Sequence, residues 1–172
     1  GSWIPRKGVA LLVALADALA DAGTTFELDL LGTGRDAESV RAAFSAQARA
    51  FVRVRPRYAQ PELPALLQTA QVLLHPSWSE GFSVALVEGM ACGLAPLATD
   101  AGASRELLRG GAAGMIIAPA SVAGFVHAIR TLDADRDQLH RLRTAAHMVA
   151  TLPSWDAIAR ETIAFYRALG PR

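Results

Sequence analysis

Residues 77–93 of the chain read SWSEGFSVALVEGMACG and join a short polar loop to an apolar helix. The apolar run Val72–His75 before them is typical of a buried strand, which Pro76 ends. Ser83 is placed to cap the helix that follows. The strand therefore delivers Glu80 to a loop, and a helix start with unpaired N–H groups and partial positive charge lies just beyond it. This order suits a ligand that carries phosphate.

Two carboxylates, Glu80 in the loop and Glu88 on the helix, form a candidate site. In the functional interpretation both face a crevice, where Glu80 touches a bound sugar and Glu88 accepts hydrogen bonds from a ribose diol. The alternative is an exposed loop acid and an ordinary solvated helix glutamate. Glu88 is the only charged residue between Gly81 and Thr99. A lone charge on an apolar helix needs a partner or a binding site, which favours the functional interpretation.

The composition fits one globular domain. With 172 residues, 52% of them hydrophobic, we expect a single domain over residues 3–172, after a Gly1-Ser2 that resembles a cloning remnant. No apolar run reaches the ~18 residues of a membrane span, and the first residues do not resemble a signal peptide. The net charge of +1 argues against nucleic acid as a partner. We expect a cytoplasmic protein, its full-length form either free or peripheral to the inner face of the membrane, and Cys92 as a packing residue in a reducing compartment.

One basic residue differs from all the others. Lys7 is the only lysine beside sixteen arginines. A compact ammonium differs from a planar guanidinium as a partner for phosphate, so Lys7 is a candidate anion ligand. The alternative is a random lysine on the surface.

Strand and helix patterns alternate along the chain. Strands are predicted over Phe26–Leu31, Phe51–Val54, Val72–His75, Leu94–Thr99 and Met115–Ile117. Helices are predicted over residues 8–22, 36–48, 61–67, 83–93 and 104–108, the last capped by Ser104, with three more apolar helical stripes after Pro119. The alternation predicts an α/β fold, a Rossmann-like parallel sheet with helices on both faces. Ligands bind such sheets outside the carboxyl ends of the strands, where Gly32 and the loops 76–80 and 100–104 can border one crevice.

Several other chemistries are poorly supported. The Gly32-Thr33-Gly34 turn could let the backbone approach a ligand, but it lacks the third glycine of a dinucleotide fingerprint and also reads as a simple strand-to-helix turn. The four histidines show no metal-ligand spacing. His75 is expected at the edge of the crevice. We therefore expect neither a metal nor a separate cofactor.

Three motifs together carry a family resemblance. Residues 76–83 (PSWSEGFS), 88–93 (EGMACG) and 98–102 (ATDAG), with Glu106, resemble the signature block of retaining glycosyltransferases of family 4. Residues 5–8 (PRKG) resemble the lysine-glycine start of that family's first helix, and residues 31–34 (LGTG) resemble its Gly-x-Gly turn. These enzymes have the GT-B fold, which consists of two Rossmann-like domains.

The resemblance implies a C-terminal, donor-binding domain that takes a nucleotide-diphospho-sugar and requires no metal. In this interpretation Glu80 holds the donor hexose and is the catalytic candidate, Glu88 holds the ribose, and Lys7 contacts the diphosphate. The remaining positions carried over are the donor-binding backbone groups of Gly32, Gly34, Gly81, Phe82 and Ser83, and the base-contacting candidates Arg57 and Tyr58.

The resemblance also implies that these residues form a fragment. The acceptor-binding N-terminal domain and the first strand, which lies near the middle of such a sheet, have no counterpart in the sequence. We therefore expect a parent enzyme that transfers a hexose, a fragment inactive by itself, and unpaired sheet edges that favour self-association. The alternatives are a GT-B relative such as a nucleotide-sugar epimerase, or a non-catalytic module that binds sugar nucleotides or proteins. The sequence does not reveal the base, the sugar or the acceptor.

Overall fold

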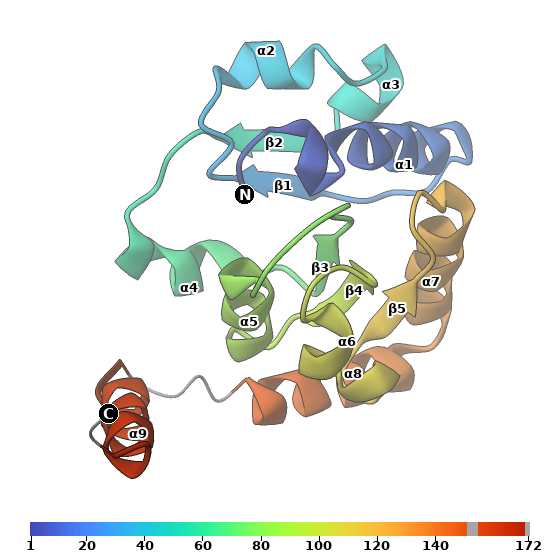
Figure 1. Ribbon diagram of the computed structural model, residues 1–172. Helices are drawn as coiled ribbons and strands as arrows, with labels where there is room; N and C mark the ends of the chain where they lie inside the picture. Colours follow the sequence, from blue (N-terminus) through green and yellow to red (C-terminus); the bar gives the residue numbers. More distant parts are fainter. Residues whose placement is uncertain (151–154, 171–172) are drawn as a thin grey trace.

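In the part of the chain that the structure describes, five short strands alternate with helices, as the sequence predicts (Figure 1). The structure is a computed structural model that describes residues 1–150 and 155–170. Its strands are β1 (Leu28–Leu31), β2 (Val52–Arg55), β3 (Val72–His75), β4 (Ala95–Thr99) and β5 (Met115–Ile117). The α-helices are α1 (Val9–Asp21), α2 (Ala37–Arg41), α3 (Ala46–Arg49), α4 (Leu63–Leu67), α5 (Val84–Ala91), α6 (Ser104–Leu107), α7 (Val122–Ala134), α8 (Arg136–Val149) and α9 (Trp155–Ala168). Three short 3-10 helices are η1 (Pro5–Lys7), η2 (Gln60–Glu62) and η3 (Arg109–Gly111).

The strands form two separate parallel sheets rather than one. In the described residues β1 pairs with β2, and β3, β4 and β5 pair in that order. Every pair is parallel; for example, Leu28 lies opposite Val52, and Val72 lies opposite Ala95. β1 and β3 are therefore edge strands. The sequence predicted the parallel α/β class but in a single sheet, and the self-association expected from unpaired edges stays a prediction.

Helix α1 packs against both sheets with different faces. Leu11, Leu15 and Leu19 join a core with β4, β5 and α7, in which Phe125 is fully buried. Ala16 and Ala20, on another face of α1, join a second core with β1, β2, α2 and α3. Because one helix contributes to both cores, it fixes the two sheets relative to one another.

The second sheet is covered on both faces, as a parallel sheet requires. Helices α5 and α8 cover the face opposite α1 and α7. Leu86 and Met90 of α5 pack there with Ala98 of β4 and Ala146 of α8. All five residues of β4 are buried.

Two predictions of local structure are wrong. The single helix expected over residues 36–48 is two short helices, because Ser45 accepts a hydrogen bond from the N–H of Ala48 and starts a new helix. Ser104 is not a cap but the first residue of α6. Its hydroxyl donates to the carbonyl of Ala101 instead of accepting from the helix.

Helix α9 lies away from both sheets in Figure 1. The sequence predicted its apolar stripe, but the stripe is exposed, with Phe165 at 63% and Leu169 at 64%. No helix in the described part of the chain is both long and apolar enough to cross a membrane.

Gly8, between η1 and α1, is required by two constraints at once. Its φ is +72°, and a Cβ there would lie 2.0 Å from the carbonyl oxygen of Pro76. We expect Gly8→Ala to lower the free energy of unfolding by about 3 kcal/mol, from ~1–2 kcal/mol of backbone strain plus ~1–3 kcal/mol of overpacking. Gly34→Ala is the matched control, because Gly34 has φ +66° but a Cβ there meets no described atom within 4 Å. If urea unfolding shows that Gly8→Ala and Gly34→Ala lower the free energy of unfolding equally, the contact with Pro76 is unimportant.

Candidate functional site

Glu80 is the centre of a partly buried polar cluster. Its carboxylate Oε1 lies 2.6 Å from Lys7 Nζ and accepts a hydrogen bond of 2.7 Å from the hydroxyl of Ser77. Its Oε2 lies 3.5 Å from the exposed guanidinium of Arg6. The Glu80 side chain is only 6% exposed. The carboxylate is therefore a fixed counter-ion for Lys7, not an acid free in solvent.

The surroundings of Glu80 hold it ionised. Burial, the largest single influence, would raise the pKa of Glu80. The hydrogen bonds from Lys7 and Ser77, followed by the positive charge of Lys7, outweigh burial and lower the pKa below its ordinary value of 4.5. Glu80 is thus a carboxylate throughout the physiological range.

His75 lies beside the cluster but carries no charge at neutral pH. Its Nε2 is 3.9 Å from Glu80 Oε1, and this buried atom has no hydrogen-bond partner among the described residues. Burial lowers the pKa of His75 below 6.5; the charge of Glu80 opposes this shift, and that of Lys7 adds to it. The imidazole is therefore neutral and is not an ion-pair partner of Glu80.

The backbone holds the loop after β3 in place. The N–H of Trp78 donates to the carbonyl of Arg6 at 2.8 Å, and the hydroxyl of Thr99 donates to the carbonyl of Ser77. The loop after β4 lies against the same segment, since a Cβ on Gly102 would lie 2.5 Å from the carbonyl oxygen of Glu80. The loops that follow β3 and β4 therefore meet at one end of the sheet, as predicted.

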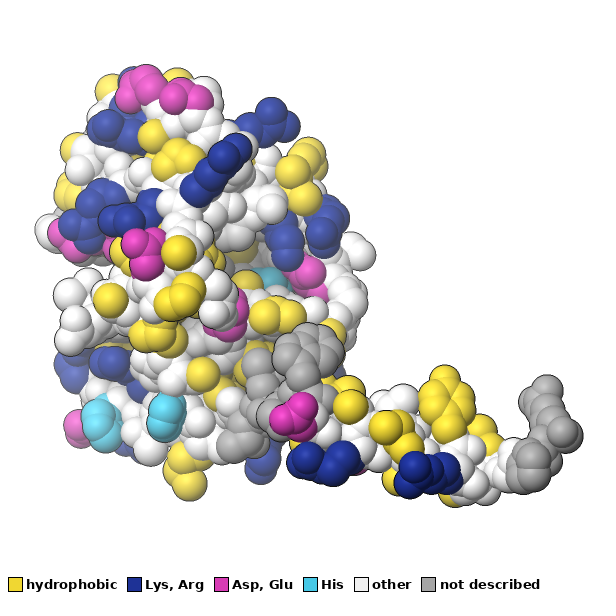
Figure 2. All heavy atoms as spheres, turned by 90° about the vertical axis from the view of Figure 1, so that its left-hand side faces the viewer, with side chains coloured by type: hydrophobic (Ala, Val, Ile, Leu, Met, Phe, Trp, Pro, Cys, Tyr) yellow, Lys and Arg dark blue, Asp and Glu magenta, His cyan; other side chains and the backbone are white. Residues whose placement is uncertain are grey.

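A cavity of about 520 Å³ opens next to this cluster. Its lining includes the polar residues Lys7, Thr33, Tyr58, Ser77 and Glu88 and residues of β1 and β3. Figure 2 shows a hollow on this side of the molecule, with basic and acidic side chains near its rim. Three predicted site residues, Lys7, Tyr58 and Glu88, thus line one cavity.

Glu88 and Tyr58 have partners that anchor them at the cavity. Gln60 Nε2 donates to Glu88 Oε1 at 3.1 Å. The ring of Tyr58 lies against Gly32, where an added Cβ would be 3.1 Å from the ring carbon Cε1. Burial, and secondarily the charge of Glu88, raises the pKa of Tyr58. The phenol is therefore neutral and can donate a hydrogen bond.

The other predicted residues are placed as follows. Ser83 is confirmed as the N-cap of α5, because its hydroxyl accepts from the N–H of Leu86. Gly81 and Phe82 are exposed just before α5. Gly34 and Arg57 are exposed. The predicted site residues that do not line the cavity are Gly32, Gly34, Arg57, Glu80, Gly81, Phe82 and Ser83. Within the described ranges, no group of three or more His, Cys, Asp or Glu side chains could hold a metal ion.

Three contributors were missed from the sequence: Arg6, Gln60 and Ser77. Ser77 stands in the loop quoted first, and its place three residues before Glu80 could have marked it as a partner. Gln60 is 28 residues from Glu88, and no local pattern links the two.

The contribution of the Lys7–Glu80 pair to stability can be measured. We expect Glu80→Gln to lower the free energy of unfolding at pH 7 by about 2–3 kcal/mol, the scale of a buried charged hydrogen bond. Asp100→Asn is the control, since Asp100 forms an exposed ion pair with Arg105 worth under ~1 kcal/mol. Because the pKa of Glu80 is lowered in the folded state, the difference in free energy of unfolding between wild type and Glu80→Gln is largest above pH 4.5. It should shrink as pH falls further. Urea unfolding between pH 3 and 7 tests this, and a pH-independent difference would contradict it.

Comparisons with known proteins agree with this architecture. Residues 1–135 match the model of the family described as glycosyl transferases group 1. A D-inositol 3-phosphate glycosyltransferase from Streptomyces bingchenggensis (strain BCW-1) is 31% identical over 115 residues, which are 67% of this chain and 25% of that protein. An alpha-maltose-1-phosphate synthase from Mycolicibacterium smegmatis (strain ATCC 700084 / mc(2)155) is 31% identical over 173 residues, covering 94% of this chain and 45% of that protein.

Solved structures show the same fold. Sucrose-phosphate synthase (tll1590) from Thermosynechococcus elongatus has a TM-score of 0.82 at 24% identity, covering 98% of this chain and 44% of that one. Anabaena Alr3699/HepE in complex with UDP has a TM-score of 0.79 at 22% identity, covering 98% and 47%. The chain spans less than half the length of these proteins, and its α/β architecture corresponds to half of a GT-B fold. With the family match over residues 1–135, the chain belongs to the group 1 glycosyl transferases.

Proposed function

We propose that this chain is the C-terminal, donor-binding half of a retaining glycosyltransferase of family 4. The parent enzyme would transfer a hexose from a nucleotide-diphospho-sugar to an acceptor held by its other half. The observation that carries this proposal is that Lys7, Tyr58 and Glu88 line one cavity. The complexes of the similar Anabaena protein with UDP, and with UDP and glucose, support a nucleotide sugar as ligand.

Lys7 and the start of α5 are the proposed diphosphate ligands. The hydroxyl of Ser83 takes only the N–H of Leu86, so the first N–H groups of α5 lack an intrahelical acceptor. These groups, the amides of Gly81 and Phe82, and the ammonium of Lys7 together can bind a diphosphate. On this proposal the donor is a substrate and no separate cofactor is needed.

Glu88 and Tyr58 are the proposed ligands of the nucleoside. The carboxylate of Glu88 keeps one oxygen for Gln60 and can accept ribose hydroxyls on the other. Tyr58, with exposed Arg57 beside it, would contact the base on this proposal. The Gly32 turn lets the backbone approach this part of the ligand.

Glu80 has two proposed tasks, one for each oxygen. Oε1 fixes Lys7 through the 2.6 Å contact. Oε2 carries only the longer approach of exposed Arg6, so it is the oxygen that can exchange that partner for a hexose hydroxyl. Glu80 thus ties the position of the sugar to the position of the diphosphate ligand.

The proposed chemistry is front-face transfer. The bond from the anomeric carbon to the diphosphate breaks, and the bonding electrons leave on the phosphate oxygen. Lys7 and the start of α5 stabilise that negative charge. The departing phosphate accepts the proton of the acceptor hydroxyl, whose oxygen bonds to the anomeric carbon on the same face. The configuration is therefore retained.

Calorimetry with UDP-glucose, GDP-glucose and ADP-glucose tests the donor site, with both this chain and the full-length parent. We expect Lys7→Ala and Glu88→Ala each to weaken the best-bound donor at least about tenfold, the loss of one charge-assisted hydrogen bond. Arg141→Ala is the control, because Arg141 pairs with Asp135 on the surface and lies outside the cavity. Unchanged affinity in both site variants would overturn the assignment.

A further inference from the structure

His75 is a buried polar side chain that the proposed function leaves without a task. It is the last residue of the otherwise apolar strand β3, and its side chain is only 8% exposed. Its Nε2 is buried and has no hydrogen-bond partner among the described residues. Buried polar atoms in proteins are nearly always hydrogen-bonded, and an apolar side chain at this position would leave no polar atom unpaired. Packing alone therefore does not account for an imidazole here.

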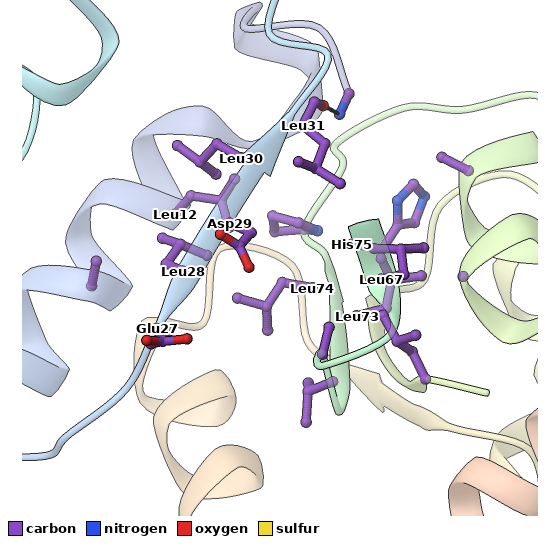
Figure 3. Close-up of a pocket in the computed structure, with 18 of the residues that line it drawn as sticks. Leu12, Glu27, Leu28, Asp29, Leu30, Leu31, Leu67, Leu73, Leu74 and His75 are labelled. Atoms are coloured by element: carbon purple, nitrogen blue, oxygen red, sulfur yellow. Dashed lines mark hydrogen bonds between the residues drawn. The ribbon is translucent and has the colours of Figure 1, made fainter. Parts of the chain in front are cut away.

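The imidazole lies beside both the cavity and the carboxylate of Glu80. His75 lines the cavity of about 520 Å³, and Figure 3 shows its ring among the side chains of the cavity wall, at the end of β3. Its Nε2 lies 3.9 Å from Glu80 Oε1, the oxygen that accepts hydrogen bonds from Lys7 and Ser77. A hydrogen bond from an imidazolium to a carboxylate spans about 2.8 Å, so a shift of about 1 Å would form one.

The backbone of His75 is fixed, so this shift would fall on side chains. His75 pairs in register with Ala98 of β4, and its carbonyl accepts a hydrogen bond of 3.4 Å from the hydroxyl of Thr99. On the other side of the gap, Glu80 Oε1 is held by Lys7, which is also the proposed ligand of the diphosphate. A diphosphate that draws the Lys7 ammonium toward itself weakens this bond, and Oε1 can then accept from His75.

Burial and charged neighbours set the protonation of the ring. Burial lowers the pKa of His75 most, and the negative charge of Glu80 opposes this shift. The positive charges of Lys7 and of the Gly1 ammonium lower the pKa further. The imidazole is therefore neutral before a ligand binds, and it offers Glu80 no positive charge.

A bound diphosphate would reverse this balance. Its negative charges would lie against Lys7 and offset the positive charge that disfavours an imidazolium. Two other charged side chains border the same region: Arg6, 3.5 Å from Glu80 Oε2, and Glu88 on the cavity wall. The paired strand β4 adds none, because its five residues are all uncharged. The pKa of His75 should therefore rise when a diphosphate binds.

We propose that His75 is a positioning residue for Glu80 in the donor complex. When the diphosphate engages Lys7, the imidazole takes up a proton from the buffer, and its Nε2–H donates to Glu80 Oε1. Glu80 then keeps a cationic partner while Lys7 serves the phosphate, so the carboxylate stays in place to hold the hexose. This inference rests on the donor site proposed above and adds a residue that the proposed function does not use.

The pH dependence of donor affinity tests this role. Because the pKa of His75 is higher in the complex than in the free chain, affinity should rise as pH falls through the higher pKa. Gly1 is acetylated throughout, because its ammonium also lines the cavity and burial lowers its pKa. Calorimetry with UDP-glucose, GDP-glucose and ADP-glucose identifies the best-bound donor. We expect that donor to bind at least about threefold more tightly at pH 5.5 than at pH 7.5, with uptake of at least about 0.3 proton per donor at pH 6.5, measured in PIPES and Bis-Tris buffers.

Three variants separate positioning from packing. In His75→Gln the side-chain amide can donate to Glu80 but does not titrate, so donor affinity should be equal at the two pH values. His75→Leu also removes the donor group, and at pH 7.5 it should bind the donor at least about threefold more weakly than His75→Gln. His140→Gln is the matched control, because His140 is exposed on α8 and does not line the cavity. It should keep the pH dependence of the wild type.

Nuclear magnetic resonance of the wild-type chain gives a test that needs no variant to fold. The ring protons of His75 should titrate at a higher pH with the donor bound than without it. If none of the three sugar nucleotides binds to this chain or to the full-length parent, the proposed function and this inference both fail. If a donor binds equally at both pH values, if His75→Gln keeps the pH dependence, or if the donor leaves the titration of His75 unchanged, this inference alone is overturned.

Discussion

The ion pair between Lys7 and Glu80 joins parts of the chain 73 residues apart. It fastens the turn before α1 to the loop after β3. The backbone bond from Trp78 to Arg6 and the close approach of Gly8 to Pro76 reinforce it. Because α1 also packs against both sheets, the ion pair and this helix together hold two sheets that no strand ladder connects in the described residues.

The ion pair between Lys7 and Glu80 also contributes to the proposed donor site. A buried carboxylate without a partner is costly, so Glu80 is stable only with its hydrogen bonds from Lys7 and Ser77. Those bonds hold the chain's single lysine at the cavity, which Ala85 of α5 also lines. One contact thus stabilises the fold and also places the cation that an anionic ligand needs.

Much of this arrangement was predictable from sequence because it depends on short-range pattern. The apolar runs gave β3 and β5 with their observed ends, and Ser83 was recognisable as a cap. Local pattern failed where two signals competed, as at Ser45, which divides a helix that otherwise reads as continuous. It also failed for contacts made only by folding: Gln60 meets Glu88, and Arg6 and Lys7 meet Glu80, through tertiary geometry that no spacing encodes.

The gap between β1 and β3 has a consequence for how the molecule comes apart. Backbone ladders are the most cooperative links in a sheet, and in the described chain none crosses the gap. The part built on β1 and β2 and the part built on β3 to β5 can therefore open as separate foldons, with α1 shared between them. Hydrogen exchange in β2 and in β4 would then report different free energies of local opening, while unfolding in urea remains one global transition.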